Sequence, residues 1–345
     1  MFENASRTEV SLLGEFGLID HIAKSFTNKQ ASTIKGIGDD AAVIDKDEEN
    51  VTLISTDLLV EGVHFDLHYM PLKHLGYKAV TVNLSDIYAM NGIPQQITVS
   101  LAFSNRFSLE AIEELYAGIK RACDFYGIDL VGGDTSTSHS GLMLSVTAIG
   151  TCKKDQVTYR SGAKEHDLIC VTGDLGAAYL GLQLLEREKK IFLETPGAQP
   201  DLEGFDYILE RQLKPEARKD MIQFLHDNKL KPTAMMDISD GLSSELHHIA
   251  KQSNVGITIY EDKLPIDPIV YNNAQELGLE STTCALNGGE DYELLFTIPQ
   301  SLFELVKNTE GISIIGHCTA AGTGINMVSK AGTQYDLPAQ GWKAV

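Results

Sequence analysis

Six short acidic loops, spread along the chain, hold the residue types that could carry out chemistry in this protein. They are 38–40 (Gly-Asp-Asp), 55–57 (Ser-Thr-Asp), 83–86 (Asn-Leu-Ser-Asp), 132–135 (Gly-Gly-Asp-Thr), 237–241 (Asp-Ile-Ser-Asp-Gly) and 288–291 (Gly-Gly-Glu-Asp). Hard divalent cations such as Mg²⁺ prefer carboxylate and hydroxyl oxygens, and they usually complete their shell with water and phosphate. Glycine beside a carboxylate lets the backbone approach a ligand closely. Together the loops predict a Mg²⁺–phosphate site assembled from distant segments.

Apolar runs before three of these loops predict strands that deliver the carboxylates. The runs are 51–55, 129–131 and 234–236, and we expect each strand to end before its carboxylate, at one rim of a sheet. Asp86 differs because it falls inside a helical pattern from Leu75 to Met90. An unpaired carboxylate near the apolar stripe of a helix is costly to bury, and either a metal ion or an Arg or Lys partner would remove that cost.

Each loop taken singly has an ordinary explanation, because Asp and Gly dominate turns in general. The prediction therefore rests on several loops of similar chemistry. The chain lacks a Walker A motif, the His-Arg-Asp and Asp-Phe-Gly motifs of protein kinases, and the Gly-x-Ser-x-Gly elbow of hydrolases. A phosphoryl-transfer enzyme with this sequence belongs to neither large kinase class. His64 and His68 lie four residues apart in extended or loop chain, which favours surface or ligand-contacting histidines over a zinc pair.

Composition excludes several classes of protein. The 28 basic and 48 acidic residues give a net charge of −20, which argues against nucleic acid or an anionic membrane as partner. The five cysteines are odd in number and form no Cys-x-x-Cys, so we expect buried thiols in a reducing compartment. The first residues show no signal-peptide pattern, and no apolar stretch approaches the length of a membrane span. We therefore expect a cytoplasmic location.

Hydrophobic periodicity predicts strands alternating with helices in both halves, which indicates an α/β or α+β fold with two domains. The clearest helix is 108–126, with Ser108 as N-cap and Gly127 at the stop position. The expected helices are 14–26, 75–90, 108–126, a helix from about 177 to 188, 216–228, 241–252 and 300–308. The expected strands are 41–44, 51–55, 96–103, 128–131, 142–149, 168–172, 235–237, 255–260, 292–298 and 312–316. Residues 190–206 predict a long surface loop, and we place the domain boundary between 152 and 153.

The motifs, in this order, resemble the thiamine-monophosphate kinase family, which belongs to a superfamily with aminoimidazole-ribonucleotide synthetase and selenophosphate synthetase. The resemblance runs from about Gly14 to the C-terminus and is specific as a set. It is carried by 36–42 (GIGDDAA), 55–65 (STDLLVEGVHF), 78–86 (KAVTVNLSD), 131–135 (VGGDT), 160–164 (RSGAK), 171–176 (VTGDLG), 237–242 (DISDGL) and 288–294 (GGEDYEL). Two stretches depart from the family pattern: the longer loop at 190–206, and 214–218 (KPEAR) in place of an Arg-Pro-rich stretch.

The resemblance implies that ATP phosphorylates thiamine monophosphate to thiamine diphosphate, the final step of thiamine diphosphate biosynthesis, with the help of several Mg²⁺ ions. The implied metal ligands are Asp39, Ser55, Thr56, Asp57, Asp86, Asp134, Asp237 and Asp240. The implied ATP contacts are Tyr116, Gly133, Asp134, Arg160 and Ser239, and the implied contacts to thiamine monophosphate are His64, Glu290 and Trp342. No His or Cys lies within the six loops, so we expect direct transfer without a phosphoenzyme.

The implied fold is that of aminoimidazole-ribonucleotide synthetase, with two domains. Its N-terminal sheet completes a barrel across a homodimer, and its C-terminal domain is α/β; strands 96–103 and 142–149 are the candidates for the barrel. Three alternatives stay open. The chain could be another ATP-dependent synthetase of the superfamily, although selenophosphate synthetase is disfavoured because no cysteine precedes Cys123. It could be a non-catalytic cation- or nucleotide-binding protein, and Trp342, the single tryptophan, could be a packing anchor.

Overall fold

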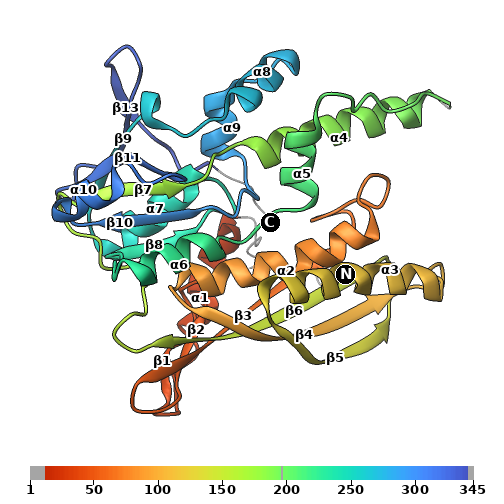
Figure 1. Ribbon diagram of the computed structural model, residues 1–345, viewed down its shortest axis with the longest axis horizontal. Coiled ribbons are helices and arrows are strands. Elements are labelled where there is room, and N and C mark those ends of the chain that lie inside the picture. Colours follow the sequence, from red (N-terminus) through yellow and green to blue (C-terminus); the bar gives the residue numbers. More distant parts are fainter. Residues whose placement is uncertain (1–11, 196, 341–345) are drawn as a thin grey trace, which may run out of the picture.

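Two mixed sheets, each covered by helices, form the molecule in the computed structural model, which describes residues 12–195 and 197–340 (Figure 1). The N-terminal half comprises α1 (Gly14–Ala23), β1 (Thr33–Lys35), β2 (Ala42–Asp45), β3 (Asn50–Val60), α2 (Leu72–Ala89), β4 (Ile93–Phe103), α3 (Leu109–Tyr126), β5 (Asp129–Thr137) and β6 (Met143–Lys153). Its sheet has the order β1-β2-β3-β6-β4-β5, with β4 and β5 parallel and the other described neighbours antiparallel.

The C-terminal half forms the second sheet, in the order β13-β12-β9-β11-β7-β10-β8. Its strands are β7 (Leu168–Thr172), β8 (Ala234–Asp237), β9 (Gly256–Tyr260), β10 (Leu294–Ile298), β11 (Ile312–Thr319), β12 (Ile325–Val328) and β13 (Gln334–Asp336). Its helices are α4 (Ala177–Glu194), α5 (Asp206–Leu213), α6 (Lys219–Asp227), α7 (Leu242–Ser253), α8 (Pro268–Glu276), α9 (Ser281–Asn287) and α10 (Phe303–Val306), and short 3₁₀ turns span Glu261–Lys263 and Gln300–Leu302. These elements confirm the α/β prediction.

Helix α2 is the centre of the molecule, because it packs against α3 and the first sheet on one side and against α5 and β8 of the C-terminal half on the other. Nearly every position from Leu75 to Ala89 is buried, including polar residues that no amphipathic surface helix would bury. Close packing of α2 on α3 requires glycine: a Cβ on Gly76 would lie 2.0 Å from the carbonyl oxygen of Leu115. The polar side chains of α2 are thus held at the junction of the two halves.

Helix α3 follows the sequence prediction in detail. The Ser108 hydroxyl accepts the backbone N–H of Ala111 at 3.3 Å, and Gly127 ends the helix in the left-handed conformation at φ 73°. Helix α4 departs from the prediction, because it continues to Glu194, so the loop expected at 190–206 begins only after that residue and ends at α5. The five cysteines all lie within the described residues, and they are buried and unpaired as expected.

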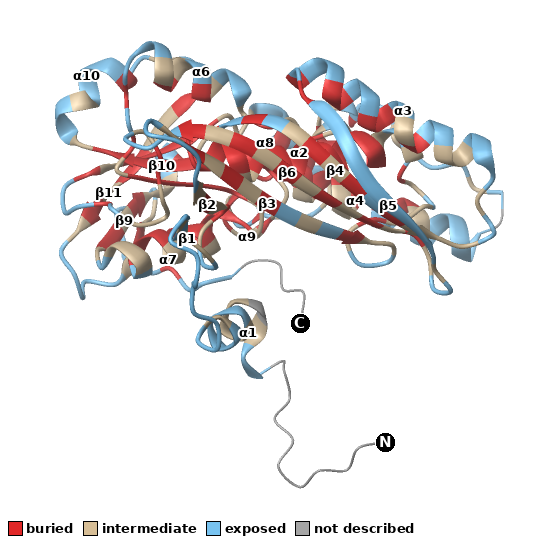
Figure 2. Ribbon diagram, turned by 90° about the horizontal axis from the view of Figure 1, so that it is seen from below, coloured by how far each residue is buried: buried red, intermediate tan, exposed pale blue. Residues whose placement is uncertain are grey.

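The prediction that these carboxylates lie at the ends of their strands holds for Asp237 and is wrong for Asp57 and Asp134. Asp237 is the last residue of β8. Strand β3 runs on through Asp57 to Val60, and β5 runs through Asp134 to Thr137. Strands of a half-exposed sheet tolerate polar side chains on every second position, so a carboxylate does not end them. Strand β5 is exposed along its whole length at the sheet edge (Figure 2).

Candidate active site

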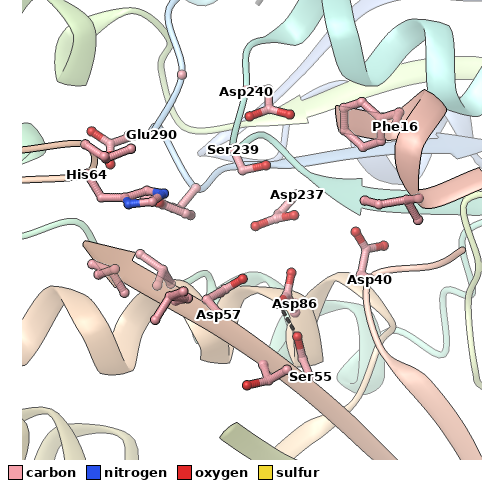
Figure 3. Close-up of a pocket in the computed structure, with 18 of the residues that line it drawn as sticks. Phe16, Asp40, Ser55, Asp57, His64, Asp86, Asp237, Ser239, Asp240 and Glu290 are labelled. Atoms are coloured by element: carbon pink, nitrogen blue, oxygen red, sulfur yellow. Dashed lines mark hydrogen bonds between the residues drawn. The ribbon is translucent and has the colours of Figure 1, made fainter. Parts of the chain in front are cut away.

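A cavity of about 1280 Å³ lies between the two halves of the molecule, and residues from both sheets line it. Strand β3 and helix α2 form its floor, while the loop after β8 and the loop before β10 border the opposite side (Figure 3). Phe16 of α1 and Asp40 lie at one end, and His64 and Glu290 lie at the other. The implied site residues within this cavity are Asp39, Ser55, Thr56, Asp57, His64, Asp86, Arg160, Asp237, Ser239, Asp240 and Glu290.

Three carboxylates converge in the cavity. Oxygens of Asp40, Asp86 and Asp237 all lie within 4.8 Å of one another, although the residues come from the loop before β2, from α2 and from the end of β8. Burial raises the pKa of Asp86, and the charges of Asp57 and Asp237 raise it further. Burial also raises the pKa of Asp237, with Asp40 as the next cause. Like charges this close are unfavourable without a cation between them.

Asp40 belongs to this cluster, although the sequence prediction chose its neighbour Asp39. Arg160 donates from Nε and Nη2 to Oδ1 of Asp40, at 3.0 and 2.6 Å. The other oxygen of Asp40, Oδ2, is buried and has no hydrogen-bond partner in the described part of the chain. A buried carboxylate oxygen without a donor, beside two other carboxylates, fits an oxygen-seeking divalent cation.

Asp39 is directed elsewhere. Its Oδ1 accepts the backbone N–H of Arg160 at 3.0 Å. Its Oδ2 is also buried without a hydrogen-bond partner in the described chain, but it lies 3.5 Å from Nζ of Lys35, whose charge offsets it. Burial and the charge of Asp40 raise the pKa of Asp39. Adjacent aspartates are indistinguishable by type, so no feature of the Gly-Asp-Asp loop by itself selects the residue that enters the cluster.

Strand alternation separates the three residues of the Ser-Thr-Asp loop. The Ser55 hydroxyl donates to Oδ2 of Asp86, and Asp57 lies on the same face of β3, its backbone N–H bound to Oδ1 of Asn83 at 3.0 Å (Figure 3). Thr56 borders the cavity, but its hydroxyl donates to the carbonyl oxygen of Val146 at 3.1 Å on the opposite face. Ser55 and Asp57 therefore join the cluster side, and the Thr56 hydroxyl does not.

Helix α2 also fixes Asp237, through a residue that sequence reasoning missed. The Ser85 hydroxyl donates to Oδ2 of Asp237 at 2.6 Å, and Ser85 is fully buried. The only signal for this role was the place of Ser85 in the Asn-Leu-Ser-Asp loop, directly before Asp86. The neighbouring helix residues Ser85 and Asp86 thus bind one residue from each half, Asp237 and Ser55.

The far end of the cavity has a different character. Glu290 stands at φ 67°, a conformation that is uncommon for residues other than glycine, and its N–H donates to the carbonyl oxygen of Ser239 at 2.7 Å. His64 accepts the backbone N–H of Val60 on Nδ1 at 3.1 Å, which orients the imidazole ring at this end of the cavity. Figure 3 shows His64 and Glu290 at the opposite end of the cavity from Asp40.

Comparison with known proteins identifies the family of this chain. A family model described as AIR synthase related protein, N-terminal domain, matches residues 38–152, and the corresponding C-terminal domain matches residues 164–321. Thiamine-monophosphate kinase of Bacillus subtilis is 38% identical over 86% of this chain and 86% of that protein, and the same enzyme of Aquifex aeolicus is 38% identical over 84% of this chain and 87% of that protein. The chain belongs to the thiamine-monophosphate kinase family.

A solved structure of this family shows the same fold. The structure described as AaThiL complexed with AMPPCP and TMP is 33% identical, covers 99% of this chain and 100% of that chain, and superposes with a TM-score of 0.83. The two-domain, AIR-synthase-like α/β fold expected from the sequence is thereby confirmed. The boundary between 152 and 153 stays a prediction, since the two family-model matches leave residues 153–163 unassigned.

Three of the implied site residues of a thiamine-monophosphate kinase lie in the described part of the chain but do not line the cavity. Gly133 and Asp134 lie in the exposed edge strand β5, and Tyr116 lies half-buried on α3, packed against the first core. Trp342 lies outside the described residues. The proposed roles of these four residues remain predictions.

No helix in the described ranges combines the length and apolarity that crossing a membrane requires.

Proposed function

We propose that the chain transfers the γ-phosphoryl group of ATP to the phosphate of thiamine monophosphate, which yields ADP and thiamine diphosphate. The convergence of Asp40, Asp86 and Asp237 in a cavity of a thiamine-monophosphate kinase carries the proposal. The relative solved with AMPPCP, an ATP analogue, and TMP supports both substrates.

The carboxylates suit a transfer between two polyanions. Asp40, Asp86 and Asp237, with Asp57 and Asp240 beside them, would hold Mg²⁺, which screens phosphate charge and stabilises the transferring phosphoryl group. These side chains contribute position and charge, and Ser55 and Ser85 fix the carboxylates through hydroxyl donors. We propose that several Mg²⁺ ions bind here, and metal analysis of the protein would give their number.

We propose that Arg160, at the end of the cavity near Asp40, contacts the phosphates of ATP. Its guanidinium is anchored on Asp40, and its pKa is raised above the ordinary value by the Asp40 and Asp237 charges, against the opposing effect of burial. An arginine fixed in this way can contact a phosphate oxygen with its remaining N–H groups. Ser239, at the start of the loop after β8, borders the same space and is the second proposed ATP contact.

Glu290 and His64 are proposed to contact the acceptor, together with Trp342. Transfer is proposed to be direct, because the aspartates are engaged as an electrostatic clamp and the acceptor phosphate needs positioning rather than a covalent relay. Inversion of configuration at a chiral γ-phosphorus supports direct transfer, and retention would show a phosphoenzyme.

The proposed assembly is a homodimer in which the first sheet completes a barrel. Support comes from β5, whose edge is unpaired in the described chain and carries Leu130 and Val131 at 42% and 58% exposure. A second copy on this side would also give Gly133 and Asp134 a partner surface. Sedimentation of a monomer of 37.7 kDa at micromolar concentration would refute the dimer. The cytoplasmic location stays a prediction, which the unpaired cysteines support.

The decisive experiment measures ADP release with thiamine monophosphate, thiamine and formylglycinamidine ribonucleotide offered separately. The proposal expects release with thiamine monophosphate alone. Release with the ribonucleotide alone would favour another synthetase of the superfamily, and release with none of the three would favour a non-catalytic binding protein.

A further inference from the structure

Lys78 of α2 is completely buried, with an exposure of 0%, and it is among the largest side chains buried below 2% in the described chain. A charged lysine is rarely buried unless it is paired, because it loses its hydration. Its Nζ lies 2.9 Å from Oε1 of Glu290 and donates to the carbonyl oxygen of Gln212 at 3.1 Å. Lys78 therefore joins α2 to a residue of the proposed acceptor end.

Gln212, at the end of α5, holds the other oxygen of the same carboxylate. Its Nε2 donates to Oε2 of Glu290 at 2.8 Å, and the side chain is 2% exposed. Glu290 is fixed from three sides, because its backbone N–H is bound to Ser239 as well. The Glu290 side chain keeps 27% exposure and lines the cavity.

Each carboxylate oxygen accepts about two hydrogen bonds, so Glu290 has one acceptor position left on each oxygen. Its two anchoring donors are buried, so the remaining positions are the ones available to a molecule in the cavity. An aminopyrimidine offers N–H donors, and a thiazolium ring offers a cation. Either group suits a carboxylate that is held by Lys78 and Gln212.

Lys78 also gives the two ends of the cavity different charge. Asp40, Asp86 and Asp237 make one end strongly acidic. At the other end Lys78 offsets the charge of Glu290, and Lys189 pairs with Asp66 and Glu186, which also line the cavity. A second uncompensated carboxylate would repel an acceptor that is itself anionic. This offset lets the organic part of the acceptor lie at Glu290 while its phosphate lies toward the metal ligands.

We propose that Lys78 and Gln212 are positioning residues for the acceptor, which act by holding Glu290 in one orientation and offsetting its charge. The inference rests on the proposed function. It differs from a purely structural role, in which the buried pair would only join α2 to the C-terminal half.

The test compares Lys78→Met and Gln212→Met with the wild type. We expect each variant to raise KM for thiamine monophosphate about tenfold or more and to leave KM for ATP within about twofold. Lys73→Met is the matched control, because Lys73 is an exposed lysine of the same helix. It should change neither KM. Lys78→Arg, which keeps the charge, should recover part of the loss.

A thermal melt of Lys78→Met, Glu290→Gln and the double variant separates positioning from folding. Lys78→Met should lower the melting temperature, since it leaves Glu290 without its ion partner, and the double variant should recover it. KM for thiamine monophosphate should stay high in the double variant. Recovery of that KM together with stability would show a structural role only.

Several results would overturn the inference. Gln212→Met, which leaves the ion pair intact, could leave KM for thiamine monophosphate within twofold of wild type, or it could raise both KM values equally. A wild type that releases no ADP with thiamine monophosphate would overturn the proposed function and this inference with it. An active wild type with unchanged variants would overturn the inference alone.

Discussion

Arg160 binds Asp40 through two hydrogen bonds to a single oxygen, Oδ1, and the second oxygen remains buried without a hydrogen-bond partner in the described chain. Oδ1 therefore fixes the orientation of the carboxylate, and Oδ2 is available to a cation. The arrangement also links a residue of the loop after β6 to the cluster formed by α2 and β8.

Replacing Asp40 should therefore cost far more activity than replacing its neighbour. We expect Asp40→Asn to lower kcat about a hundredfold or more, because an amide cannot supply the charge that a metal ligand needs. Asp39→Asn, the matched control, should lower kcat about tenfold or less, since Asp39 contacts Lys35 and the Arg160 backbone. Steady-state kinetics at saturating Mg²⁺ measures both, and equal losses would contradict the choice of Asp40.

Asp57→Asn should nearly abolish turnover while the fold stays intact. Asp57 lies on the cavity face of β3 beside Ser55, and its charge is among those that raise the pKa of Asp86. The circular dichroism spectrum should match that of the wild type. Turnover within about tenfold of wild type at saturating Mg²⁺ would refute a ligand role.

Mg²⁺ should stabilise the ligand-free protein. The clustered charges of Asp40, Asp86 and Asp237 repel one another, and a cation that binds only the folded state raises the free energy of unfolding by about 2.7 kcal/mol at a hundred times its Kd. A thermal melt with Mg²⁺, with and without nucleotide, should show a higher Tm than one with sodium chloride at equal ionic strength. Identical melts would argue against a metal site.

Asp291 should make stability fall as pH rises. Burial raises its pKa to about 7, although Arg211 and the N–H of Gly176 oppose the rise. The folded state therefore keeps a proton that the unfolded chain loses near its ordinary pKa of about 4, so the free energy of unfolding decreases between those two values. Asp291→Asn removes this dependence, and its Tm relative to wild type should increase from about pH 5 to about pH 8.

The control for this measurement is Asp124→Asn, because Asp124 is an exposed aspartate whose side chain keeps 65% exposure beside Lys120. Its Tm difference from wild type should stay constant over the same range. A constant difference for Asp291→Asn as well would mean that Asp291 titrates normally in the folded protein.

Trp342→Ala should raise KM for thiamine monophosphate about tenfold, with KM for ATP little changed. An aromatic ring over the thiazolium cation contributes roughly 1–2 kcal/mol when the contact is desolvated, and about 1.4 kcal/mol corresponds to tenfold. Initial rates measured at varied concentrations of each substrate give the two KM values. Similar increases in both KM values would favour the packing role of this residue instead.

Local patterns in the sequence predicted several features correctly. The Ser108 N-cap and the Gly127 C-cap of helix α3 were predictable because capping depends only on residues within about one turn of each helix end. The alternation of apolar residues in β6 was also recognisable, because a strand with one buried face repeats its apolar positions every two residues. The choice of family rested on motif order, which the comparisons support.

Long-range contacts decided what local patterns could not. Asp39 and Asp40 are the same residue type in the same loop, and contacts with distant Arg160 distinguish them: its guanidinium binds Asp40, whereas its backbone N–H binds Asp39. Strand β3 likewise continues through Asp57 because it pairs with β6 from Asn50 to Val60. Helix α5, which supplies Gln212, was not among the predicted helices, and it packs against α4.

The sequence by itself determined the chemistry of this protein: oxygen ligands in glycine- and serine-flanked loops, a strongly acidic chain, and the order of motifs. The tertiary structure decided which of those oxygens meet. It brought Asp40, Asp86 and Asp237 together, turned the Thr56 hydroxyl away, and buried Lys78 against Glu290. The physical reason is that residue type follows from the chain alone, whereas proximity depends on how α2 packs between two sheets that are far apart in sequence.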